Sequence, residues 1–270
     1  MEAVRAHPTG GRVEARLHPS ARDPAAGPAA LERIVAADRR LAWDACLNVR
    51  DIGGLTCGDV LLARGRLVRA SMIGTLTDAG RAAVRAHGIR TVIDLRGDDE
   101  VAESASPYRE GVTYRRVPFT SARIMALHDG AHAGTLADEL RRIAVPDGGL
   151  ADVIGAIAEA EPAILLHCVA GRDRTGIVIA TLLAALGVPD AEIVADYAAS
   201  DAELVPEYER FKAENPDRAA AVDDGVAKRA WVMERTLAAL REAFGGAAPY
   251  LGLAGVRAEQ LDAIRAKLTA

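Results

Sequence analysis

Short continuous apolar runs alternate with longer helical patterns along the middle of the chain. The runs predict four strands, at residues 67–69, 91–95, 113–117 and 163–167. Two segments between them, residues 76–87 and 150–160, carry apolar side chains at helical spacing. Strands that alternate with helices predict an α/β fold, in which helices flank a central, largely parallel sheet.

Two neighbouring apolar segments enclose a polar loop. Residues 163–166 are continuously apolar, which is typical of a strand buried on both faces. Residues 175–186 are too many for a strand and too apolar for a surface helix, so they predict a buried helix. The loop between them, rich in glycine and charge, is therefore held between two buried elements.

The two ends of the chain have different patterns. Beyond Pro189 the spacing predicts a mainly helical C-terminal half, with helices at residues 191–200, 203–214 (interrupted by Pro206), 226–244 and 258–268. Residues 1–40 hold four prolines and no sustained apolar period, apart from a short predicted helix around residues 31–39. We expect a poorly ordered or extended N-terminal extension, followed by a folded domain at residues 41–270.

Composition and charge narrow the class of protein. Of the 270 residues, 50% are hydrophobic and 26% are charged, as in soluble globular proteins. The net charge of −5 provides no basic field for a phosphate backbone, so we expect no nucleic-acid partner. The longest apolar stretch, residues 176–188, is shorter than the roughly 20 residues that span a bilayer, so we expect no integral membrane segment.

The cysteines and the first twenty residues indicate the cellular compartment in which we expect the protein. Three cysteines are an odd number without metal-ligand spacing, which is typical of a reduced, cytoplasmic protein. The first twenty residues lack the apolar core of a secretory signal. We expect a cytoplasmic protein, and a leaderless route out of the cell stays open.

The loop after the predicted strand at 163–167 has the chemistry of an anion site. Cys168 follows the strand, and Arg174 stands six positions later, where the next helix begins. Loop N–H groups and a helix N-terminus bind a tetrahedral anion, and a guanidinium adds a fork to two of its oxygens. The same field stabilises a thiolate, so we expect the pKa of Cys168 to lie well below about 8.5.

Two simpler interpretations compete with this one. A cysteine at a strand end is often a small buried hydrophobe, and an arginine at a helix start is often solvated. The joint pattern of strand, Cys168, Arg174 and apolar helix favours a nucleophile aimed at phosphorus over both. The acidic cluster at residues 98–100 is interpreted as a solvated helix start.

The loop and its flanks resemble a known family. Residues 167–176 read HCVAGRDRTG, which resembles the His-Cys-x5-Arg-Ser/Thr signature of cysteine-dependent protein tyrosine phosphatases. The inner part is similar to the bacterial subgroup with an HCxAGKDRTG loop, which includes the tyrosine phosphatase B type. Arg172 stands where that subgroup usually has lysine. Other similar segments are residues 48–54 (NVRDIGG), 68–71, 91–96, and Asp196-Tyr197 with Ser200.

The resemblance implies a role for each loop residue. Cys168 is the implied nucleophile, forming a phosphocysteine intermediate, and Thr175 assists the departing thiolate. His167 is expected to brace the loop. The implied phosphate-binding residues are Cys168, Val169, Ala170, Gly171, Arg172, Asp173 and Arg174. No metal and no cofactor is implied.

The general acid has two main candidates, and Asp129 is a distant third. The resemblance favours Asp173, which could instead be a carboxylate that only stabilises the helix N-terminus. Asp94 is the second choice, because the carboxyl ends of parallel strands meet at one crevice. Its alternative role is an ion pair with Arg96 or Arg50.

The implied activity is hydrolysis of phosphotyrosine by a catalytic domain at residues 41–270. Phosphoserine, phosphothreonine and phosphoinositides are further candidate substrates, so the expected partner is a phosphoprotein or a phosphorylated small molecule or lipid headgroup. A phospho-binding module without turnover and a rhodanese-like sulfurtransferase are the alternatives. Residues 201–229 are either a helical lid over the site or two ordinary surface helices. The oligomeric state stays open.

Overall fold

The computed structural model describes residues 39–102, 108–109, 111–119, 148–227 and 229–270. The N-terminal extension expected at residues 1–40 therefore lies almost wholly outside the described residues, as does nearly all of the helix predicted around 31–39. Asp129 also lies outside the described residues.

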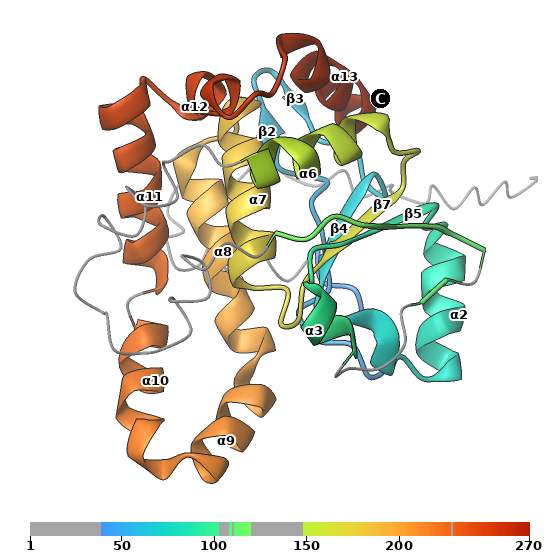
Figure 1. Cartoon of the computed structure of the whole chain (residues 1–270), viewed down its shortest axis with the longest axis vertical. Coiled ribbons are helices and arrows are strands. Elements are labelled where there is room, and N and C mark those ends of the chain that lie inside the picture. The colour runs from blue at the N-terminus through green and yellow to red at the C-terminus, as the bar shows by residue number, and fades with distance from the viewer. Residues whose placement is uncertain (1–38, 103–107, 110, 120–147, 228) are drawn as a thin grey trace, which may run out of the picture.

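A five-stranded sheet forms the centre of the molecule (Figure 1). Its order is β1 (Arg50–Asp51), β4 (Leu67–Ala70), β7 (Ile164–His167), β5 (Thr91–Asp94) and β6 (Thr113–Arg116). The last four are parallel, and β1 is antiparallel to β4. The expectation of a largely parallel sheet flanked by helices is confirmed, and each of the four predicted strands agrees within one residue at either end.

Three short strands were not predicted. These are β1 and the hairpin of β2 (Thr56–Cys57) and β3 (Val60–Leu61), each two residues long. Two residues are too few to show a period of two, so only pairing with a partner strand reveals them.

Successive side chains of the sheet point to opposite faces, and both faces are buried. Leu67, Ile164 and Leu166 pack in the larger core, whereas Val68 and Leu165 pack in the smaller one. The larger core is completed by residues of α6, α7, α8, α11, α12 and α13, and the smaller core by residues that include Val84 of α2. This burial on both sides explains the continuous apolar runs.

The helices connect the strands and form the C-terminal half (Figure 1). Before β7 they are η1 (Ile73–Thr75), α2 (Asp78–His87), α3 (Asp98–Ala102) and α6 (Gly148–Glu159). After β7 they are α7 (Asp173–Ala185), α8 (Asp190–Glu203), α9 (Val205–Glu214), η2 (Pro216–Arg218), α10 (Ala219–Ala227), α11 (Arg229–Phe244), α12 (Ala247–Leu253) and α13 (Ala258–Thr269).

The helix predictions need three corrections. The helix predicted at residues 226–244 starts too late, because α10 already begins at Ala219; the described residues of that range are helical in α10 and α11, and residue 228 lies outside the described residues. The short helix α12 was not predicted, since glycines on both sides interrupt its pattern. Pro206 does not interrupt its helix but stands in the first turn of α9, where proline costs no hydrogen bond.

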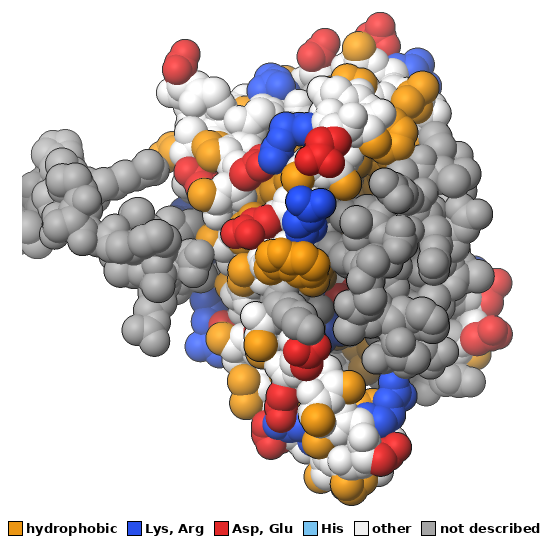
Figure 2. Space-filling view, turned by 90° about the vertical axis from the view of Figure 1, so that its left-hand side faces the viewer, with side chains coloured by type: hydrophobic (Ala, Val, Ile, Leu, Met, Phe, Trp, Pro, Cys, Tyr) orange, Lys and Arg blue, Asp and Glu red, His pale blue; other side chains and the backbone are white. Residues whose placement is uncertain are grey.

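The surface formed by the C-terminal helices carries acidic and basic side chains side by side (Figure 2). No helix in the described part of the chain is long and apolar enough to cross a bilayer.

Candidate active site

The parallel register brings three strand ends to one edge of the sheet. His167 at the end of β7 pairs with Ala70 of β4 and with Asp94 of β5. Cys168 follows β7 directly, is only 3% exposed, and begins the loop that leads into α7 (Figure 1). The loop therefore lies at the carboxyl edge, where open α/β sheets bind their ligands.

Hydrogen bonds fix the carbonyl groups of this loop from outside. The Met72 amide donates to the carbonyl oxygen of Val169 at 2.8 Å, and Asn48 Nδ2 donates to that of Ala170 at 3.0 Å. An Arg69 terminal nitrogen donates to the carbonyl oxygen of Gly171 at 2.7 Å. A trans peptide group holds its C=O and its N–H on opposite sides. The N–H groups of residues 170–172, which belong to the same three peptide groups, therefore point away from these donors. Such successive N–H groups form an anion cradle.

Arg174 has a carboxylate partner that sequence reasoning missed. Its two terminal nitrogens donate to the two Glu100 oxygens at 2.6 and 2.5 Å. Glu100 is in α3 and is itself held by the Gly97 amide at 2.9 Å. The interpretation of residues 98–100 as a solvated helix start is thus wrong for Glu100. No local signal marks it, since the pair joins residues 74 positions apart.

His167 precedes Cys168 in the chain, Thr175 follows Arg174 at the start of α7, and both are buried. The Thr175 hydroxyl has no hydrogen-bond partner among the described residues, so it is available to a sulfur or a ligand. His167 Nδ1 lies 3.0 Å from the Cys168 carbonyl oxygen, and since a carbonyl only accepts, Nδ1 carries the proton. Burial holds the pKa of His167 below its usual value, so the ring is neutral at pH 7.

Asp94, the second candidate for the general acid, has a full set of partners. Three Arg96 side-chain contacts reach its two oxygens, at 2.7 to 3.1 Å, and the Tyr114 hydroxyl donates to it at 2.8 Å. It is fully buried. Burial alone would raise the pKa of Asp94, but the hydrogen bonds from Arg96 and the charge of Arg96 hold the pKa below its usual value.

Asp173, the first candidate, stands at the first position of α7 and is 8% exposed. Both of its oxygens accept hydrogen bonds from Arg172, each at 2.9 Å. Arg172 also donates to the Tyr208 hydroxyl of α9 at 2.8 Å, and that hydroxyl donates to Asp201 at 2.8 Å. The fork of Arg172 thus links the loop to α9. Whether residues 201–229 act as a lid stays a prediction.

A buried cluster of charge lies behind the loop. Asp196 of α8 is 1% exposed and contacts the guanidinium groups of Arg39, Arg50 and Arg69. The sequence marks Asp196 and Arg50 only through the family resemblance, because the pairs span up to 157 positions. Burial alone would raise the pKa of Asp196, but the three arginines hold it far below its usual value.

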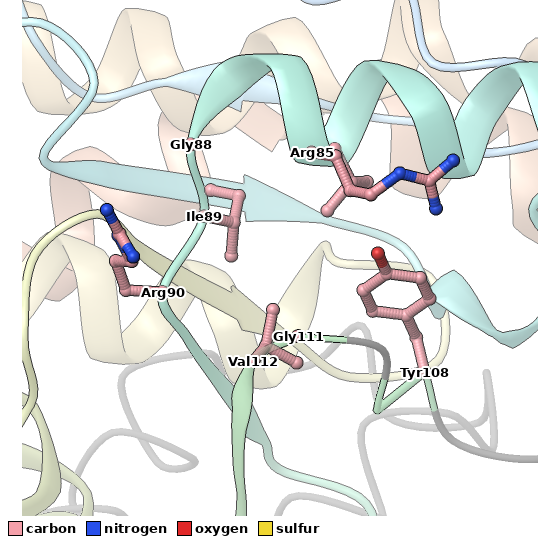
Figure 3. A pocket seen from close by; sticks show the side chains of 8 residues that line it. Arg85, Gly88, Ile89, Arg90, Tyr108, Gly111 and Val112 are labelled. Atoms are coloured by element: carbon pink, nitrogen blue, oxygen red, sulfur yellow. The ribbon is translucent and has the colours of Figure 1, made fainter.

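A separate hollow of about 400 Å³ lies at the opposite edge of the sheet (Figure 3). It is bordered by the end of α2 and by residues just before β5 and β6, among them Arg85, Arg90 and Tyr108. Neither Cys168 nor any other loop residue borders it, so it is not part of the candidate active site.

Comparisons with known proteins show the family of the chain. The model of the tyrosine phosphatase family matches residues 41–270. The triple specificity protein phosphatase PtpB of Mycobacterium tuberculosis is 30% identical over 258 residues, covering 83% of this chain and 85% of that protein. A tyrosine-protein phosphatase of Nostoc commune is 33% identical over 230 residues, covering 78% of this chain and 77% of that one. A solved structure of P. aeruginosa TpbA in complex with pTyr covers 65% of this chain and 90% of that chain, at 15% identity and a TM-score of 0.32.

Proposed function

The chain belongs to the tyrosine phosphatase family, and we propose that it removes phosphate from phosphotyrosine with Cys168 as its nucleophile. The observation that carries this proposal is the loop after β7. There a cysteine at the floor of an anion cradle is joined by Arg174 at the start of α7. The loop amides and the guanidinium stabilise charge on the transferring phosphoryl group.

The reaction then proceeds in two displacements. In the first, the Cys168 thiolate attacks phosphorus, the S–P bond forms, and the P–O bond to the tyrosine breaks as its oxygen takes a proton from the general acid. In the second, water attacks the phosphocysteine and gives its proton to the same carboxylate. The S–P bond breaks, and the Thr175 hydroxyl, which has no partner among the residues that the structure describes, donates to the leaving thiolate.

We assign the general acid to Asp173. Asp94 is fully buried, and the arginine that holds its oxygens keeps it ionised, so it has no proton to donate near neutral pH. Asp173 lies in the loop itself, and both of its oxygens accept hydrogen bonds from the neighbouring Arg172, a residue of the implied phosphate-binding set. Transfer of Arg172 to the substrate phosphate would release Asp173 for protonation.

The test is phosphate release from a phosphotyrosine peptide without added metal, for wild type, Cys168→Ser, Asp173→Asn and Asp94→Asn. We expect no turnover for Cys168→Ser and a loss of about 10²- to 10⁴-fold in kcat for Asp173→Asn. Burst kinetics with trapping of a phosphocysteine would show the intermediate directly.

Each contrary outcome has a defined meaning. Near-normal turnover of Asp173→Asn, with a large loss in a folded Asp94→Asn, moves the acid role to Asp94. A wild type that binds the peptide but never releases phosphate is a phospho-binding module. Turnover that survives in Cys168→Ser overturns the thiolate mechanism.

Substrate range and location extend the proposal. The relative from M. tuberculosis is named a triple specificity phosphatase, which supports testing phosphoserine, phosphothreonine and phosphoinositide substrates beside phosphotyrosine. The three cysteines are free, which supports a reducing, cytoplasmic location. Cell fractionation with an antibody against the chain tests that location.

A further inference from the structure

We propose that Asp196 is a positioning residue that orients two successive peptide groups of the phosphate-binding loop, one through Arg69 and the other through Arg50 and Asn48. This role rests on the proposed function, because it concerns how the same loop is kept ready for phosphate. Asp196 itself lies on α8, behind the loop. Among the described residues, its connection to the loop backbone runs through the side chains of Arg69, Arg50 and Asn48.

The charge cluster around Asp196 is costly to bury. Arg39 and Arg69 reach its two oxygens at 2.8 and 2.5 Å, and Arg50 Nε lies 3.4 Å from one of them. All four side chains are at most 2% exposed. Burying several charges in this way does not by itself stabilise a fold beyond what apolar residues provide. A cluster placed directly behind the active-site loop therefore points to a role in organising that loop.

The first connection runs through Arg69. One terminal nitrogen donates to Asp196 at 2.5 Å, and the other donates to the Gly171 carbonyl oxygen at 2.7 Å. The same nitrogen lies 3.4 Å from the Arg172 carbonyl oxygen. The planar guanidinium thus fixes the distance between the carboxylate and the loop, as a flexible ammonium could not.

The second connection runs through Arg50 and Asn48. Arg50 contacts Asp196 through Nε and donates from one terminal nitrogen to Asn48 Oδ1 and from the other to the Asp196 carbonyl oxygen. With its oxygen held in this way, the Asn48 amide must present its nitrogen to the Ala170 carbonyl oxygen, at 3.0 Å. The carboxylate therefore fixes the orientation of the amide.

The two connections end on consecutive peptide groups. Fixing the carbonyl oxygens of Ala170 and Gly171 on the Asp196 side turns the N–H groups of Gly171 and Arg172 to the other side, toward the cradle. If either peptide flipped, a carbonyl oxygen would replace an N–H there and repel the phosphate. Gly171 has a φ of +64°, in the left-handed region where glycine moves most freely, so this is the part of the loop that most needs external support.

The test measures binding of tungstate, a tetrahedral oxyanion, to the full-length protein by isothermal titration calorimetry, which requires no turnover. We expect Asp196→Asn, Arg69→Lys and Asn48→Asp each to weaken tungstate binding about tenfold or more. Asn48→Asp keeps the acceptor for Arg50 but replaces the donor to Ala170 with an acceptor. The double variant Asp196→Asn/Arg69→Lys is expected to bind tungstate about as weakly as Asp196→Asn alone, because Arg69 carries one of the two connections that Asp196→Asn already disturbs.

The matched control is Arg39→Met. It removes one of the three guanidinium groups around Asp196 and leaves both connections in place, so its tungstate affinity should stay within about twofold of wild type, whatever its Tm. Circular dichroism shows which variants fold, and if Asp196→Asn does not, Arg69→Lys and Asn48→Asp decide the question.

Three results would overturn the positioning role. One is wild-type tungstate affinity in a folded Asp196→Asn, and another is wild-type affinity in both Arg69→Lys and Asn48→Asp. The third is an equal loss in Arg39→Met, which would mean that the cluster acts only through stability. A wild-type protein that neither binds tungstate nor releases phosphate would instead overturn the proposed function, on which this role rests.

Discussion

At the scale of single residues, the loop depends on a glycine that approaches another backbone. Gly171 has a φ of +64°, and a Cβ built there would lie 2.1 Å from the Ala70 carbonyl oxygen. Ala70 is the last residue of β4, buried in the sheet, so it cannot yield. Both the backbone angle and the close approach therefore require glycine.

We expect Gly171→Ala to lose about 1–3 kcal/mol of unfolding free energy and at least about tenfold in kcat/KM, because the loop must shift off β4. Chemical denaturation and peptide hydrolysis measure the two effects. Gly187→Ala is the control. It has the same sign of φ, at +82°, but nothing within 4 Å of the added carbon, so it should lose some stability and keep its activity. An equal loss of activity in both variants would contradict this account.

Arg172 is the residue at which the loop departs from the subgroup sequence. Its fork holds both Asp173 oxygens and the Tyr208 hydroxyl at once, which a single ammonium cannot do. We expect Arg172→Lys to keep kcat within about threefold, since the positive charge beside the phosphate is retained, and Arg172→Ala to raise KM about tenfold or more. Steady-state kinetics on a phosphotyrosine peptide test both. A kcat loss in Arg172→Lys as large as in Asp173→Asn would show that the fork itself is needed.

At the scale of elements, α7 and α9 differ in how they are anchored. Eleven of the thirteen residues of α7 are buried, whereas all ten residues of α9 are described and none is fully buried. In Figure 1, α9 and α10 project beyond the sheet, on the side of the loop. The Arg172–Tyr208 contact ties α9 to the loop.

We expect hydrogen exchange in residues 201–227 to be faster than in α7, because few apolar contacts hold these helices. Tyr208→Phe should accelerate exchange in α9 further, since it removes the hydroxyl that joins Arg172 to Asp201. Exchange mass spectrometry measures both effects, with α6 as an internal reference that should not change. Protection of α9 equal to that of α7 would make it an ordinary packed helix and remove the idea of a lid.

At the scale of the whole molecule, buried charge connects stability to pH. The pKa of Asp196 and that of Asp94 are held below their usual values by arginine partners, and burial holds the pKa of His167 below its own. In all three cases the unfolded chain binds protons more readily than the folded one. Stability therefore falls as the pH is lowered.

The expected profile follows from these signs. The contribution of His167 to the free energy of unfolding is complete above its unfolded-state pKa of about 6.5 and declines as the pH falls below that value. The contributions of Asp94 and Asp196 are complete above about pH 4 and decline as the pH falls further. We expect the unfolding free energy to be level near pH 7–8, to decline gently toward pH 5 and to fall steeply below pH 4. Denaturant titrations at each pH measure it. Asp196→Asn should be less stable at neutral pH, and its unfolding free energy should fall less steeply below pH 4 than that of wild type. An equally steep fall would contradict the contribution assigned to Asp196.

The sequence by itself determined the loop and the elements that flank it. The continuous apolar run before His167 and the apolar helix after Arg174 are local patterns, and Cys168 and Arg174 stand only six positions apart along the chain. Burial on both faces of the sheet produces such runs, so they can be predicted without a fold. The two-residue strands could not be predicted, because such short segments show no period.

Only the tertiary structure decided which charges meet. Glu100 reaches Arg174 across 74 positions and Asp196 reaches Arg69 across 127, and neither pair is visible as a pattern along the chain. Their meeting depends on the order and register of β4, β7 and β5, which place separate strand ends at one edge. Local spacing determines whether a segment is a strand or a helix, whereas long-range contacts depend on how whole elements pack. The proposed nucleophile Cys168 was therefore found in the sequence, and the contacts by which other side chains hold its loop were found only in the fold.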